Sequence, residues 1–150
     1  MVNQLKVHDQ IKELFNSQML GVLATEQNSQ PHTSLVAFAS SNDLKHILFA
    51  TSRKTRKFSN LKENPSVAIL VDSRSHRDSD FHSAIAVTAY GKAYEEKKDN
   101  SNVNLKHFLT KHPHLIDFVS KPTCALLKIK VEKYSIVSNF QNVRELVLES

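Results

Sequence analysis

The side chains best suited to chemistry in this chain lie in one short stretch, residues 51–57, which reads TSRKTRK. It combines three hydroxyls with four cations. Phe58 and Leu61 follow at helical spacing, and the dipeptide Asn64-Pro65 ends that pattern, because the residue before a proline is disfavoured in the α region. The apolar residues 47–50 come directly before the stretch and are typical of a strand. The hydroxyls and cations therefore belong to a junction where a strand turns into a helix.

A strand-to-helix junction of this composition suits a phosphate group. The first N–H groups of a helix lack partners inside the helix, and the helix dipole places positive charge at the same end. Basic and hydroxyl side chains add hydrogen-bond donors there. The alternative is that the four cations form a solvated loop with no ligand.

Bulk composition bounds the class of protein. The 150 residues suit one domain, 1–150, and 40% hydrophobic with 23% charged residues is typical of a soluble globular chain. No apolar run approaches the ~20 residues of a membrane span, and the N-terminus lacks the pattern of a secretion signal. The single cysteine, Cys124, excludes an internal disulfide and is expected to be a buried residue of a strand. We therefore expect a cytoplasmic protein.

The net charge of +5 would attract nucleic acid, acidic lipid or a phosphorylated small molecule, and it does not decide between them. The two glycines, Gly21 and Gly91, are too few for a Walker loop or a dinucleotide fingerprint. A phosphate must therefore be held by side chains and a helix start. A nucleic-acid module is the weakest alternative, because the chain has no tryptophan and no strand that alternates aromatic with basic residues.

The order of hydrophobic patterns predicts a β-barrel with peripheral helices. Strands are expected over residues 19–25, 32–39, 46–51, 66–72, 84–94, 124–137 and 143–148. Helical stripes are expected in four places: at Val7, Ile11, Leu14 and Phe15; over residues 56–64; at Leu105, Phe108 and Leu109; and at Leu115, Phe118 and Val119. Short polar turns favour antiparallel pairing. Gly91 and a one-residue phase slip after Val131 both predict a bulge.

Several motifs together resemble the pyridoxamine 5′-phosphate oxidase-like FMN-binding split barrels. They are Phe49-Ala50-Thr51, Thr55-Arg56-Lys57, Glu63-Asn64-Pro65-Ser66-Val67 and the later stretch Ala89–Ala93. The resemblance covers residues 20–93, about half of the chain, and continues more loosely to the C-terminus. It implies a mainly β fold, a six- or seven-stranded antiparallel split β-barrel that forms a homodimer with FMN between the subunits.

The resemblance also implies which residues contact the cofactor. Thr51, Thr55, Arg56 and Lys57 would contact the FMN phosphate and ribityl chain. The isoalloxazine ring would lie along the strand that carries Ser34, Leu35, Val36 and Ala37, with Ala50 beside it. The implied activity is that of an FMN-dependent oxidoreductase whose substrate and electron donor, NAD(P)H or another, are open. No catalytic residue is predicted.

The sequence departs from the family's enzymes at positions that matter for vitamin B6. Ser34 and Ala39 stand where those enzymes carry an arginine and a lysine, and Ala86 stands where they carry a glutamine. The C-terminus also lacks their stretch with arginine and histidine. These differences argue against pyridoxamine phosphate oxidation and favour one of the short relatives.

Other possibilities stay open. The chain could carry FMN, deazaflavin or haem without turnover, with His32 or His82 as the available haem ligand. The motif His76-x-Asp78-x-Asp80-x-His82 has ligand types for a metal, but its position in a polar loop favours an interface role. Arg74 and Arg77 of that loop could approach a partner's flavin, and Phe140-Gln141-Asn142 could cap the flavin pocket.

Overall fold

The computed structural model describes residues 2–148, which form a seven-stranded sheet and several helices. The strands are β1 (Leu20–Gln27), β2 (Gln30–Ser40), β3 (His46–Ser52), β4 (Ser66–Asp72), β5 (Ile85–Glu96), β6 (Cys124–Ser138) and β7 (Asn142–Val147). The helices are α1 (Val2–Ser17), α2 (Arg56–Glu63), α3 (Asp80–Ser83), α4 (Val103–Lys111) and α5 (Ile116–Ser120), with a 3-10 turn at Pro113–Leu115. Each strand predicted from the sequence is present, with ends that shift by a few residues.

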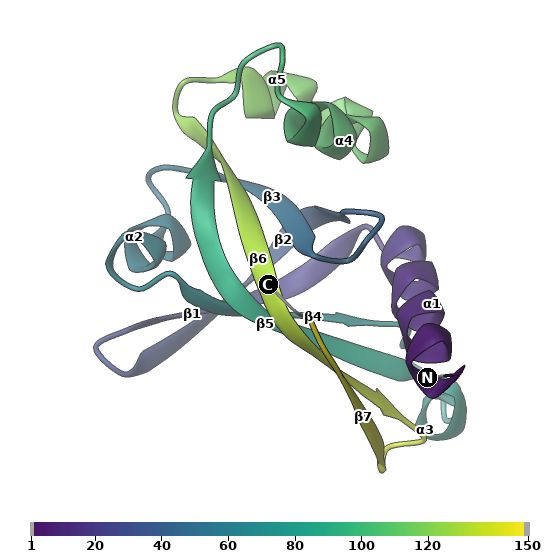
Figure 1. Cartoon of the computed structure of the whole chain (residues 1–150). Helices are drawn as coiled ribbons and strands as arrows, with labels where there is room; N and C mark the ends of the chain where they lie inside the picture. Colours follow the sequence, from purple (N-terminus) through teal and green to yellow (C-terminus); the bar gives the residue numbers. More distant parts are fainter. Residues whose placement is uncertain (1, 149–150) are drawn as a thin grey trace.

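The strands close into a barrel. Their order is β3-β2-β1-β4-β5-β6-β7, every pairing is antiparallel, and β3 also pairs with β6. Six strands thus form a closed barrel, and β7 lies beside β6 as an extra strand (Figure 1). The predicted mainly β, antiparallel barrel with peripheral helices is confirmed. A homodimer stays a prediction.

The core follows from the alternation of the strands and the stripe of α1. Ile11 and Phe15 of that helix are fully buried against the barrel. The Phe15 ring meets Phe38 of β2 and Tyr134 of β6 edge-on, with ring centroids 5.3 and 5.8 Å apart. The predicted opening helix is therefore part of the main core, which fixes β2 from the inside.

One bulge interrupts the β5–β6 ladder. Tyr90 lies opposite Lys133, and the next pair is Gly91 with Val131, so Glu132 has no partner across the ladder. The glycine and the phase slip were separate signals in the sequence, and the structure shows that they are the two sides of one bulge. Both predictions are confirmed.

The segment that holds α4, the 3-10 turn and α5 packs on the outside of the barrel, over β2, β3 and β6 (Figure 1). Its apolar stripes form a second, smaller core with three strand residues; the members are Ala39, Leu48, Phe108, Val119 and Leu126. Cys124 is buried at the start of β6, as expected. Among the residues that the structure describes, no helix is both long and apolar enough to cross a membrane.

Candidate functional site

The junction between β3 and α2 is built around two threonines. Thr55 is the N-cap of α2, and its Oγ1 accepts a hydrogen bond from the Phe58 N–H at 3.3 Å. The same hydroxyl donates to the Ser52 carbonyl at 2.9 Å and lies 3.0 Å from Oγ1 of Thr51. Thr51 is only 2% exposed. The two hydroxyls therefore stabilise the turn between β3 and α2 by hydrogen bonds.

A cavity of about 350 Å³ opens beside this junction. Seven of the nine residues predicted to contact the cofactor line it: Leu35, Val36, Ala37, Ala50, Thr51, Thr55 and Lys57. Four further residues complete the lining: Ser52, Phe108, Leu115 and Phe118. The cavity thus has a polar end at the start of α2 and an apolar wall from β2, β3 and the α4–α5 segment.

Two predicted contact residues do not line the cavity. Ser34 shares the inward side of β2 with Val36, and its buried hydroxyl has no hydrogen-bond partner among the described residues. Arg56 begins α2 and its side chain is exposed. Each is next in sequence to a lining residue, Ser34 to Leu35 and Arg56 to Lys57.

The apolar wall is the part of the site that the sequence analysis missed. Phe108, Leu115 and Phe118 were predicted as helical stripes, which is correct, but not as neighbours of β2 and β3. Two histidines hold this segment against the barrel. His107 Nε2 lies 2.7 Å from the Ser40 carbonyl, and His112 Nε2 lies 2.7 Å from the Phe38 carbonyl.

His112 makes this attachment sensitive to acid. The side chain is 1% exposed, and burial lowers its pKa below the unfolded value of 6.5. The folded state therefore binds fewer protons, and stability should fall as the pH drops below about 6.5. We expect acidification from neutral pH to reduce the free energy of unfolding more in the wild type than in His112→Gln, which keeps a side-chain N–H but does not titrate. Urea unfolding at both pH values measures this, and equal losses in the two proteins would refute it.

The cations of residues 51–57 have different partners. Arg53 forms two hydrogen bonds with the Glu95 carboxylate, at 2.9 and 2.7 Å, and a third with the Pro122 carbonyl at 3.1 Å. This pairing lowers the pKa of Glu95 and keeps Arg53 out of the cavity. Lys54 is exposed and does not line the cavity.

Lys57 differs from these cations. It is partly buried, it lines the cavity, and it has no ion-pair or hydrogen-bond partner for its amine within residues 2–148. Burial lowers its pKa. A desolvated cation without a counter-charge is costly, and an anion bound beside it would remove that cost.

The loop after β4 has its own internal order. Asp80 accepts hydrogen bonds from Ser75 and from the His76 N–H, and Arg74 pairs with Asp72 through two contacts of 2.8 Å. Within the described part of the chain, no group of three or more ligand-type side chains is placed to hold a metal. Arg74 and Phe140 line a separate, largely apolar cavity of about 360 Å³, where the Phe140 ring stacks on Phe81 at 5.0 Å.

Comparison with known families agrees with the fold. The profile of the family described as pyridoxamine 5′-phosphate oxidase matches residues 7–138, which is most of the chain. The chain belongs to this family. The matched residues include β2, β3, α2 and the α4–α5 segment. Every element that lines the cavity therefore lies within the part of the chain that matches the family.

Solved structures share the fold at low sequence identity. A haem-binding protein from Mycobacterium smegmatis is 16% identical with a TM-score of 0.82, over 93% of this family member and 57% of that chain. General stress protein 26 from Bacillus anthracis is 22% identical with a TM-score of 0.66, over 95% and 98% of the two chains. A FAD-binding protein from Mesorhizobium loti is 17% identical with a TM-score of 0.67, over 85% and 89%. The chain thus spans little more than half of the mycobacterial protein and nearly all of the other two. A separate comparison with curated proteins finds no match.

Proposed function

We propose that the chain binds FMN in the cavity beside α2 and acts as an FMN-dependent oxidoreductase. The observation that carries this proposal is the Lys57 amine, which is desolvated, faces the cavity and has no counter-charge among the described residues. The start of α2 and the Thr51 and Thr55 hydroxyls surround the same end of the cavity. Membership of the family supports a flavin as the source of the phosphate.

The chain's own residues would bind and orient the cofactor. Lys57 and the two threonines would hold the phosphate end, and the apolar wall with Ala37, Ala50 and Phe118 would exclude water from the ring. A bound flavin supplies hydride or electron transfer, and the protein contributes position and electrostatics. Lys57 is the one titratable side chain among the described lining residues, so we assign no acid–base residue to this chain.

A homodimer is part of the proposal. The outer side of β2, β1 and β4 carries apolar side chains that lie in one cross-strand row, Leu35 opposite Val22 and Val22 opposite Leu70. Leu35 is 67% exposed, and Leu20 on the same face is 53% exposed. We propose that a second copy covers this face, since an exposed apolar surface is a common mark of an interface. Leu35 also lines the cavity, so the partner would add a wall to the flavin site.

Haem is the second candidate, because one similar structure is named a haem-binding protein. The lining argues against it. No histidine, cysteine, methionine or tyrosine is among the described residues that line the cavity, and these are the side chains that ligate haem iron. His32 and His82, the ligands considered from the sequence, also lie outside the lining. Mass spectrometry of the copurified small molecule separates FMN, deazaflavin and haem directly.

The proposal predicts a specific loss on Lys57→Gln. Removal of one charge-assisted hydrogen bond should weaken FMN binding by about tenfold or more. Quenching of flavin fluorescence during titration with protein gives the dissociation constant. Lys54→Gln, three residues away and outside the lining, is the matched control and should bind like the wild type.

Two results would contradict the proposal. Equal FMN affinity in Lys57→Gln and Lys54→Gln would show that Lys57 does not bind the phosphate. A sedimentation mass equal to one chain, measured on the flavin-loaded protein, would show that the protein is not a homodimer. Reduction of the bound flavin by NAD(P)H without oxygen then separates an enzyme from a carrier.

A further inference from the structure

A row of basic side chains crosses the outer face of three strands, at the end of β3 that lies away from the flavin cavity. His46 of β3 is opposite Lys130 of β6, and Lys130 is opposite Lys92 of β5. Directly opposed side chains of antiparallel strands lie about 5 Å apart, and the like charges of Lys92 and Lys130 at that distance destabilise a sheet. This pair is therefore an electrostatic cost to the fold of the described residues.

The charges of this row lack partners in the described structure. Within residues 2–148, none of Lys45, Lys92 and Lys130 forms an ion pair. The neighbouring position behaves differently, because Lys128 pairs with Glu96 at 2.8 Å. Among residues 2–148, one outward lysine of β6, Lys128, is thus neutralised, and the next one, Lys130, has no counter-charge.

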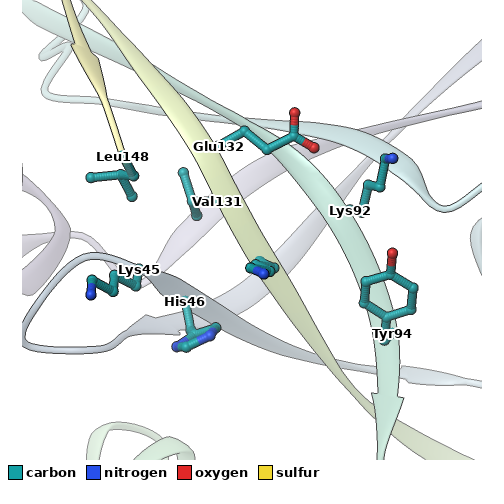
Figure 2. A pocket seen from close by; sticks show the side chains of 8 residues that line it. Lys45, His46, Lys92, Tyr94, Val131, Glu132 and Leu148 are labelled. Carbon is teal, nitrogen blue, oxygen red and sulfur yellow. The ribbon is translucent and has the colours of Figure 1, made fainter. Parts of the chain in front are cut away.

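A cavity of about 380 Å³ lies over this row, within the size range of small-molecule sites. Its lining comprises Lys45, His46, Lys92, Tyr94, Lys130, Val131, Glu132 and Leu148. Figure 2 shows Lys45 and His46 on one side of β6 and Lys92 and Tyr94 on the other. Glu132, the unpaired residue of the bulge, supplies the single carboxylate of the lining against three lysines.

The remaining lining side chains give the cavity an apolar component. Tyr94 is 50% exposed and presents its ring to solvent beside Lys92 (Figure 2). Val131 and Leu148 form an apolar wall on the opposite side of β6. Burial, together with the charge of Lys128, lowers the pKa of His46, which favours a neutral imidazole that can donate or accept a hydrogen bond. Amines bind the negative charge of a ligand by charge-assisted hydrogen bonds, and an exposed aromatic ring can stack on a ring of the same ligand.

We propose that this cavity is a second binding site, for an organic anion that carries an aromatic ring and at least two negative charges. Along β6, the Glu132 carboxylate and the Lys128–Glu96 pair lie on either side of Lys130, so the unpaired positive charge does not extend along this strand. Lys130 sits at its centre in register between the other two strands. The site does not depend on the flavin, because no residue lines both cavities.

The test uses adenosine triphosphate as the probe, by isothermal titration of the wild-type chain in the presence of excess FMN. We expect saturable binding of one molecule per chain, weaker binding of tripolyphosphate, and still weaker binding of adenosine. Lys130→Gln should lower the affinity for adenosine triphosphate by about tenfold or more. Tyr94→Ala should weaken adenosine triphosphate and leave tripolyphosphate unchanged.

Two control variants carry the same change of charge. Lys106→Gln alters an exposed lysine of α4 outside this cavity, and Lys57→Gln alters the flavin cavity; both should bind adenosine triphosphate like the wild type. Absence of saturable binding would overturn the proposal. So would an equal loss in Lys106→Gln and Lys130→Gln, which would show general charge attraction. A loss in Lys57→Gln alone would place the nucleotide in the flavin cavity, and an unchanged affinity in Tyr94→Ala would exclude recognition of the ring.

Discussion

Gly91→Ala is expected to destabilise the protein by at least about 3 kcal/mol, because the added methyl group would meet backbone and not a movable side chain. A Cβ at Gly91 would lie 2.2 Å from the Lys130 carbonyl oxygen and 3.0 Å from the Cα of Val131. Relief requires β5 and β6 to separate at the bulge, within the longest ladder of the barrel. Urea unfolding followed by far-UV circular dichroism measures the loss.

Gly21→Ala provides the matched control in the same sheet. A Cβ at Gly21 would lie 3.1 Å from Ile69 side-chain carbons and 3.2 Å from the Leu70 carbonyl oxygen, so a small shift of one side chain relieves most of the contact. We expect a cost of about 1 kcal/mol or less there. If both variants lose the same stability, close packing of β5 against β6 is not what requires the glycine.

The bulge shows how far local sequence can predict this fold. Gly91 and the phase slip after Val131 are local signals, and both point to the irregularity that the structure contains. The strands were predictable for the same reason, since alternation of side chains needs no knowledge of distant partners. Closure of the barrel through β3 and β6 joins segments far apart in the chain, and it came from the family resemblance and the strand count, not from any one motif.

The candidate site also has a part that the local sequence predicts and a part that depends on distant segments. Thr51, Thr55 and Lys57 are close in sequence, and the helix start that gathers them can be identified from their spacing. Phe108 and Phe118 reach the cavity only because the α4–α5 segment folds back over β2 and β3, and no local pattern encodes that contact. Pairing of Arg53 with Glu95 is equally non-local.

The predicted contacts of Ser34 and Arg56 with the cofactor stay predictions, and neither residue lines the cavity. The helical turn of about 100° per residue separates Arg56 from Lys57. Ser34 shares its side of β2 with Val36, which does line the cavity, so Ser34 differs from Val36 by its place along the strand and not by its side. The structure places the two side chains outside the cavity lining, one inside the barrel and one in solvent.

Lys98→Met is expected to lower the free energy of unfolding by about 2–3 kcal/mol and to weaken flavin binding with it. The Lys98 amine donates to three backbone carbonyls where α5 returns to the barrel, those of Val119 at 2.8 Å, Lys121 at 2.7 Å and Cys124 at 2.5 Å. Methionine keeps the length of the side chain and removes every donor. Urea unfolding and the FMN titration measure the two effects.

The two readouts are linked through α5. This helix carries Phe118 in the cavity wall and Val119 in the second core, so loosening its end would expose the apolar side of the proposed flavin site. Lys97→Met is the matched control, because its exposed side chain has no hydrogen-bond or ion-pair partner among the described residues. Equal stability of the two variants would show that water replaces the three contacts of Lys98. A stability loss with unchanged FMN affinity would show instead that the α4–α5 segment braces the barrel without forming part of the flavin site.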